Sequence, residues 1–219
     1  MMETFFESFA RTFVGFVQAT GVTLQLTVTS LLLACVIGLL FAFMKLSRYR
    51  LLRLVADAYI GLIRGTPLIV QIMWLYFGIT NLLVLSKFWA GVLALAIHSG
   101  AYIAEIFRGA IQSIDKGQMQ AARSLGMSHT LAMRRIILPQ AFRRAIPPLG
   151  NQFIIGLKDS SLVAFIGVQE IFNVSMSEAA ATFRQLEFYT IAGLYYLVLV
   201  IVFTLIVNRL EKRLDRRNR

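Results

Sequence analysis

The chain has 219 residues, of which 58% are hydrophobic and 15% are charged, with a formal net charge of +11. Soluble domains carry about 25% charged residues. This composition, with a mean hydropathy of +0.70, therefore excludes an ordinary soluble domain and indicates an integral membrane protein.

The first segment, residues 1–21, begins with acidic residues and lacks the basic start of a secretory signal. Phe5, Phe9, Phe13 and Phe16 recur at helical spacing. That spacing predicts either an amphipathic helix lying at the outer membrane interface or an outward extension of the first membrane span.

Five segments are candidates for membrane spans, because a spanning helix needs ~20 mostly apolar residues. The fourth in chain order is more polar than the others and contains "LKDSS". We therefore predict one all-α membrane domain covering 1–219, without an internal repeat, whose spans are 22–44, 54–79, 88–111, 145–172 and 188–208.

The basic residues are distributed asymmetrically about these spans. The segments after spans one, three and five hold seventeen, whereas the alternate segments hold only Arg11, Lys87 and Arg184. This bias predicts an N-terminus outside and a C-terminus in the cytoplasm, and it explains the charge without a nucleic-acid partner. The seventeen are Lys45, Arg48, Arg50, Arg53, Arg108, Lys116, Arg123, Arg134, Arg135, Arg143, Arg144, Arg209, Lys212, Arg213, Arg216, Arg217 and Arg219.

Residues 112–144 form the only sizeable segment predicted outside the membrane, on the cytoplasmic side. Gln118–Leu125 is good helix-forming sequence, and Gly126 suits a left-handed helix end. Ser128 can cap a second helix, which Pro139 interrupts. The small side chains favour docking against a partner, although an ordinary amphipathic connector would have the same pattern.

This loop resembles a known motif. Gln120-Ala121-Ala122, then Gly126, then Ile136, Leu138 and Pro139 match "EAA-x3-G-x9-I-x-LP", the signature of permease subunits in ATP-binding-cassette (ABC) importers. The departure is Gln120, where that family usually has Glu. The stretches 59–71, 97–118, 143–154 and 157–168 resemble its polar amino-acid branch, which includes histidine, glutamine, glutamate, arginine and cystine permeases, and most resemble the glutamine type.

The resemblance implies a type I importer permease with five spans and a cytoplasmic coupling helix between spans three and four, located in the inner membrane. It implies a second permease subunit, identical or different, two ATP-binding subunits that hold ATP and Mg, and an external binding protein that delivers an amino acid. The coupling residues carried over from the motif region are Gln120, Ala121, Ala122, Ser124, Leu125 and Gly126.

No chemistry of its own is indicated for this chain. It has no "GxxxxGK[ST]" loop for nucleotide phosphates and no His/Cys cluster with metal spacing. The lone Cys35 excludes a disulfide within the chain. We therefore expect a transport subunit, with no cofactor or metal, and ATP hydrolysis on a separate subunit.

Span two carries a candidate substrate contact. Arg64 lies near mid-bilayer and is followed by Gly65-Thr66-Pro67, which favours a broken helix. A cation beside a break could bind a substrate carboxylate, with Thr66 nearby. Alternatively, Arg64 pairs structurally with Asp57 or Glu105.

Two further regions are candidates for the substrate pathway. In span three, His98, Tyr102 and Glu105 recur at i, i+4 and i+7 beside Ser99, which predicts a polar face that lines the pathway or bonds another subunit. In "GLKDSSL", Gly156 would weaken a helix, and Asp159, Ser160 or Ser161 would cap a new one with free N–H groups.

The expected substrate class rests on the residue at position 61. Many relatives carry an acidic residue where this chain has Gly61, so a glutamine-, glutamate- or cystine-like substrate is expected. The alternative is a cationic amino acid, with Asp57, one turn earlier, replacing the missing acid. Rival classes are a secondary transporter driven by an ion gradient and a scaffold or channel-like membrane protein.

Overall fold

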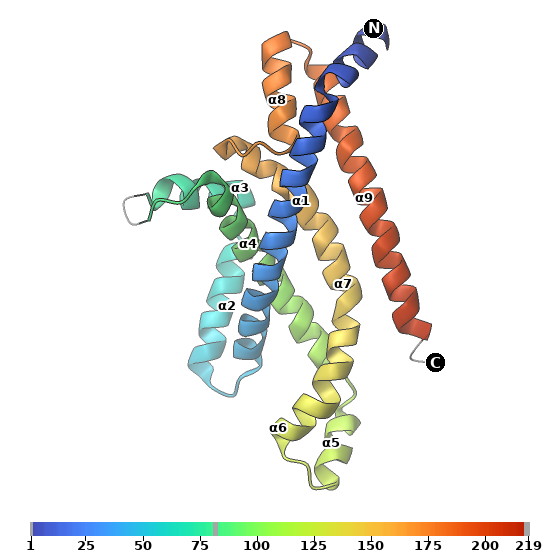
Figure 1. The fold of residues 1–219 in the computed structure, drawn as a ribbon. Helices are drawn as coiled ribbons and strands as arrows, with labels where there is room; N and C mark the ends of the chain where they lie inside the picture. The colour runs from blue at the N-terminus through green and yellow to red at the C-terminus, as the bar shows by residue number, and fades with distance from the viewer. Residues whose placement is uncertain (1, 81–82, 217–219) are drawn as a thin grey trace.

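The computed structural model describes residues 2–80 and 83–216, and these are folded entirely into helices and their connections (Figure 1). Arg217 and Arg219 of the C-terminal basic cluster lie outside the described residues. The helices are α1 (Met2–Leu46), α2 (Arg50–Arg64), α3 (Leu68–Met73), α4 (Lys87–Gln112), α5 (Lys116–Ser124), α6 (His129–Ala132), α7 (Leu138–Asp159), α8 (Ile171–Thr182) and α9 (Gln185–Arg216). Two π-helical turns (Trp74–Gly78 and Met133–Ile137) and a 3₁₀ helix (Ser160–Ile166) join them.

The N-terminal segment continues the first span as one helix rather than forming a separate interfacial helix. α1 runs unbroken for 45 residues. Phe16 is fully buried, and its ring stacks on Tyr195 of α9 at 5.1 Å between ring centres. Arg11 also pairs with Glu178 of α8 at 3.0 Å. Phe5, Phe9 and Phe16 therefore pack in a cluster with α8 and α9, whereas Phe13 is exposed.

Three helices are long and apolar enough to cross a membrane, and the bent pair α2–α3 makes a fourth if it counts as one span; this holds for the described residues. They are Phe5–Leu46, Lys87–Gln112 and Gln185–Arg213. α7, in the place of the predicted span 145–172, is not among them; it carries Arg143, Arg144, Lys158 and Asp159. The hydropathy of the helices thus supports three or four of the five expected spans.

The predicted break in span two is confirmed. α2 ends at Arg64, and α3 leaves it at 104°. Pro67 immediately precedes α3, in extended conformation, and has no N–H to continue the α2 ladder.

The predicted break at "GLKDSSL" is wrong. α7 runs through Gly156 to Asp159 and passes directly into the 3₁₀ helix, which ends at Gly167 with a φ of 77°. Asp159 makes no side-chain cap, and Ser160 and Ser161 donate back to the carbonyls of Leu157 and Lys158. Because the helical backbone is continuous, no helix start with free N–H groups exists here.

Pro139 does not interrupt the second cytoplasmic run as expected. It lies in the first turn of α7, directly after the π-helical turn Met133–Ile137. Proline is tolerated at a helix start, since its missing N–H has no partner there in any case. α6, the π turn and α7 therefore continue from the α5–α6 end towards the opposite end of the molecule (Figure 1).

Two glycines allow α1 and α4 to pack closely. A β-carbon placed on Gly38 would lie 2.5 Å from Cγ2 of Ile103, and one on Gly100 would lie 2.8 Å from Cγ2 of Ile37. The two backbones approach because neither glycine has a side chain. This contact anchors α4, which carries the candidate site residues of span three.

We predict that Gly38→Ala lowers the free energy of unfolding by about 1–3 kcal/mol, because the added methyl overpacks the α1–α4 contact. The matched control is Gly21→Ala in the same helix, where no atom lies within 4 Å of the new carbon. Thermal denaturation of both variants in detergent checks this, and equal melting temperatures would contradict the packing argument.

Candidate functional site

The break between α2 and α3 is held by one side chain that the sequence analysis did not single out. Nε2 of Gln71, in α3, lies 2.9 Å from the carbonyl oxygen of Ile63, 3.1 Å from that of Thr66 and 2.8 Å from the Thr66 hydroxyl. Thr66 in turn donates to the Leu62 carbonyl at 2.9 Å. A glutamine one helical turn beyond a Gly-Thr-Pro break, in otherwise apolar sequence, was the available signal.

Arg64 stacks on Tyr102 rather than pairing with an acid. Its Cζ atom lies 5.1 Å from the centre of the Tyr102 ring. Within the described residues, no carboxylate lies in salt-bridge range of Arg64, and Asp57 and Glu105 are bound to other cations. The alternative that Arg64 pairs structurally with either acid is therefore wrong, and its guanidinium is open to a ligand.

The polar face predicted on span three divides into two parts. His98 Nδ1 lies 3.1 Å from Oε1 of Gln71, and the His98 ring lies 5.2 Å from Tyr102. Glu105 instead contacts Lys45 and Arg108, and Ser99 is buried. The structure thus brings Arg64, Thr66, His98 and Tyr102 together around the break, and separates Glu105 from them.

An ion cluster joins α1, α2 and α4. The ammonium of Lys45 lies 3.0 Å from Asp57 and 2.7 Å from Glu105, and Glu105 also binds Arg108 at 2.6 Å. Lys45 and Glu105 are mostly shielded, with side chains 27% and 20% exposed. Shielding strengthens these attractions, so the cluster fixes the end of α1 against α2 and α4.

The region 158–161 lies apart from this group as far as its contacts show. Ser160 is fully buried, and its hydroxyl donates to the Leu157 carbonyl of its own helix at 2.8 Å. Asp159 is half-buried and Lys158 is exposed. No contact joins Asp159 or Ser160 to Arg64, Thr66 or His98 among the described interactions.

A hollow of about 360 Å³ lies beside the break. Thr66 and Gln71 supply its polar groups, and the remaining lining is apolar: Leu62, Ile63, Val70, Trp74, Leu75, Ala94 and Ile97. An apolar wall with a few placed polar groups is typical of small-molecule sites.

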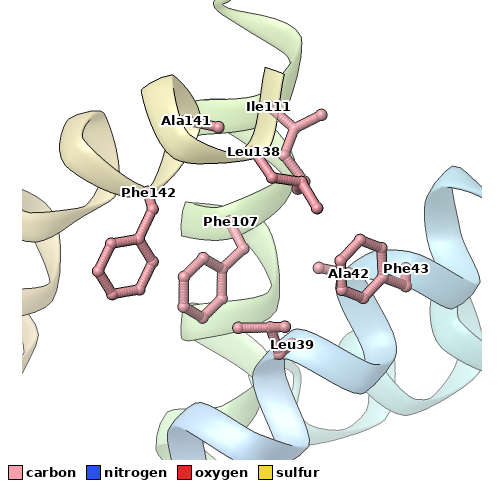
Figure 2. Close-up of a pocket in the computed structure, with 8 residues that line it drawn as sticks. All are labelled: Leu39, Ala42, Phe43, Phe107, Ile111, Leu138, Ala141 and Phe142. Carbon is pink, nitrogen blue, oxygen red and sulfur yellow. The ribbon is translucent and has the colours of Figure 1, made fainter. Parts of the chain in front are cut away.

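A second hollow, of about 160 Å³, is lined only by apolar side chains of α1, α4 and α7, with the rings of Phe107 and Phe142 on one side and Phe43 on another (Figure 2). It has no hydrogen-bonding side chain to orient a polar solute. We therefore assign this hollow to the packing interface between these helices and not to the functional site.

The segment 112–144, predicted to be cytoplasmic, includes two short helices at the end of the molecule opposite the N-terminus and α8 (Figure 1). Asp115 caps α5 by accepting from the Gly117 amide at 2.6 Å, and Ser128 caps α6 as expected. Gly126 has a φ of 82°, which is the left-handed turn expected for it. The α5–α6 pair is therefore a defined helical hairpin.

One face of α5 is open and the other is packed. Gln120, Ala121, Ser124 and Leu125 are exposed, and Leu125 is 83% exposed although it is apolar. Ala122 is 1% exposed, so it packs on the chain itself. Arg144 of α7 donates to the Ser113 hydroxyl at 3.1 Å and steadies the start of the hairpin.

No metal centre is formed: no group of three or more His, Cys, Asp or Glu side chains is placed to hold an ion within the part of the chain that the structure describes. The arrangement offers a cation stacked on an aromatic ring, an imidazole and an amide at a helix break. It is suited to binding a polar solute within a helical membrane protein and not to covalent chemistry.

The fold and the site thus define a helical membrane transport subunit. Residues 34–217 match the family model described as "Binding-protein-dependent transport system inner membrane component", and the chain belongs to this family. Its sequence is 42% identical over 201 residues to the glutamine transport system permease protein GlnP of Escherichia coli (strain K12), covering 90% of this chain and 92% of that protein.

Two further similarities agree with this family. The arginine transport system permease protein ArtQ of Bacillus subtilis (strain 168) is 38% identical over 199 residues, covering 90% of this chain and 91% of that protein. A chain of the solved structure titled "Crystal structure of an amino acid ABC transporter with histidines" is 41% identical, with a TM-score of 0.90, covering 95% of this chain and 98% of that chain. The predicted family resemblance is confirmed.

We predict that Lys45→Met destabilises the protein by about 2 kcal/mol, because it leaves Asp57 without its cation and Glu105 with only Arg108. Arg11→Met is the matched control, since Arg11 is 59% exposed in its pair with Glu178 and exposed pairs contribute ~0–1 kcal/mol. Thermal melts in low and high salt test this. An Arg11→Met effect as large as that of Lys45→Met would contradict it.

Proposed function

We propose that this chain is the permease subunit of an ATP-driven importer of polar amino acids. The observation that carries the proposal is sequence identity. This chain is more than 40% identical to a glutamine permease and to a chain of an amino-acid ABC transporter, each over at least 90% of its sequence. In this proposal the chain spans the inner membrane five times, with α7 and the 3₁₀ helix as the fourth span. Its N-terminus is outside and its C-terminus is cytoplasmic.

The α5–α6 hairpin is the contact for an ATP-binding subunit. Its exposed side chains Gln120, Ala121, Ser124 and Leu125 present a small, partly apolar surface. Gly126 turns the chain behind them, and Ala122 holds α5 to the rest of the protein. Nucleotide and Mg belong to that partner, since this sequence has no phosphate-binding loop of its own.

Arg64, Thr66, His98 and Tyr102 form the part of the substrate pathway contributed by this chain. Arg64 and Thr66 are exposed in the single chain, so a second permease subunit, identical or different, is required to enclose them. Ser99, Glu105 and Ser160 take positioning roles, because their contacts are within the protein, and the half-buried Asp159 is placed with them. An external binding protein delivers the substrate to this pathway.

The substrate is a neutral or acidic polar amino acid of the glutamine, glutamate or cystine kind. Gly61 offers no acid for a cationic side chain, and Asp57 is bound by Lys45 at 3.0 Å. Asp57 is therefore poorly placed to replace the missing charge. A cationic amino acid is the second candidate, favoured by the 38% identity to ArtQ.

A secondary transporter is the rival from another class. It would take up substrate into vesicles under an ion gradient with no ATP-binding subunit present. Uptake that depends on the ATPase and on ATP supports the proposal, and uptake by this chain alone would overturn it.

We predict that Arg64→Ala abolishes uptake in proteoliposomes that hold the complete transporter, because the substrate carboxylate loses its cation. Arg64→Lys, which keeps the charge but loses the planar stack on Tyr102, should retain part of the uptake. Assembly with the partner subunits, followed by size-exclusion chromatography, is the control. Wild-type KM and rate in Arg64→Ala would refute the assignment.

We predict that Gly126→Leu abolishes uptake and uncouples ATPase activity from substrate delivery, while membrane insertion is unchanged. A branched residue in the left-handed conformation costs about 1–2 kcal/mol and adds bulk at the docking face. Gly126→Asn tolerates that conformation better and should remain partly coupled. ATPase assays with and without binding protein measure this; normal coupling in Gly126→Leu would contradict it.

A further inference from the structure

We propose that Gln71 is a positioning residue that locks the break between α2 and α3 and fixes the tautomer of His98, so that His98 presents a bare ring nitrogen as a hydrogen-bond acceptor. The assignment to the substrate pathway rests on the proposed function. The assignment of the tautomer rests on hydrogen-bond geometry alone.

The orientation of the Gln71 amide follows from its neighbours. Two backbone carbonyl oxygens, those of Ile63 and Thr66, lie 2.9 and 3.1 Å from one end of the amide. Carbonyl oxygens only accept hydrogen bonds, so this end must be the NH₂ group. The opposite orientation would place three oxygens together at the end of α2.

The Thr66 hydroxyl agrees with this orientation. It donates its hydrogen to the Leu62 carbonyl at 2.9 Å. Its oxygen is then an acceptor for Gln71, 2.8 Å away, and because the amide has two hydrogens for three acceptors, one hydrogen is shared between two oxygens. Carbonyls in the last turn of a helix lack partners within the helix. Gln71 satisfies one such carbonyl, that of Ile63, across the break, and it binds the Thr66 carbonyl that follows the helix end.

The other end of the amide determines the state of the imidazole. Oε1 of Gln71 lies 3.1 Å from Nδ1 of His98, and an amide oxygen only accepts. Nδ1 of His98 therefore carries the hydrogen. A neutral imidazole has a single N–H, so Nε2 is left as an acceptor.

As a result, a hydrogen-bond donor, Arg64, and an acceptor, His98, both lie beside the Tyr102 ring. The Arg64 guanidinium, which only donates, and the His98 ring lie 5.1 and 5.2 Å from the centre of the Tyr102 ring. A donor and an acceptor together suit a polar amino acid, whose carboxylate accepts and whose ammonium donates. Gln71 sets this arrangement through its hydrogen bonds to the break and to His98.

The test is ¹⁵N NMR of the intact permease in its complex, with histidine labelled in this chain only. The chain has two histidines, so a His129→Gln background leaves one signal pair, recorded in alkaline buffer where the ring is neutral. We expect the Nδ1–H tautomer in the parent. We expect Gln71→Leu to convert at least half of it to the Nε2–H form.

Gln71→Glu is the matched variant. Its carboxylate still accepts from Nδ1 of His98, so the tautomer should be retained, but it cannot donate to the carbonyls of Ile63 and Thr66. It should therefore raise KM by about as much as Gln71→Leu while keeping the parent tautomer. An Nε2–H parent, or an unchanged tautomer in Gln71→Leu, would overturn the proposal.

Transport provides the second readout. Loss of the oriented acceptor should weaken substrate affinity by about 1.4 kcal/mol, which is a tenfold change. Gln71→Leu should therefore raise KM about tenfold. Its substrate-independent ATPase activity should stay at the parent level. An unchanged KM would overturn the proposed positioning role. If Arg64→Ala kept full uptake, the proposed pathway would fail while the tautomer assignment would be tested independently by the spectra.

Discussion

The structure depends first on the close approach of α1 and α4. Gly38 and Gly100 allow Ile103 and Ile37 to lie directly against backbone, at distances that leave no room for a β-carbon. In lipid, where apolar surface gains little by burial, such close packing supplies much of the attraction between helices. The α1–α4 contact fixes the position of α4, which carries His98 and Tyr102. It thereby determines where the candidate site forms.

The break in the second hydrophobic segment is the second constraint. A helix end inside a membrane protein leaves backbone carbonyls without water to bind. Gln71 and Thr66 supply those partners through hydrogen bonds of 2.8–3.1 Å. The same bonds place Gln71 against His98. The requirement to satisfy the backbone and the requirement to build a polar site are thus met by the same side chains.

Several features could be predicted from local sequence because they depend on local chemistry. The left-handed turn at Gly126 and the cap at Ser128 each follow from one residue type. The break at Gly65–Pro67 follows from a proline without an N–H. The same reasoning failed at Gly156 and at Pro139. A glycine only weakens a helix, and a proline can be absorbed by a π turn, so neighbouring contacts decide whether such a helix continues.

The sequence by itself determined the class of protein, the family and the location of the polar loop, because hydropathy, charge bias and motif spacing are properties of the linear chain. Tertiary structure alone decided the partners of the intramembrane charges. From the sequence, Asp57 and Glu105 were candidate partners of Arg64, but the end of α1 brings Lys45 to both. The role of Gln71 likewise required the 104° bend, since hydrogen bonds across a break depend on direction and distance in space.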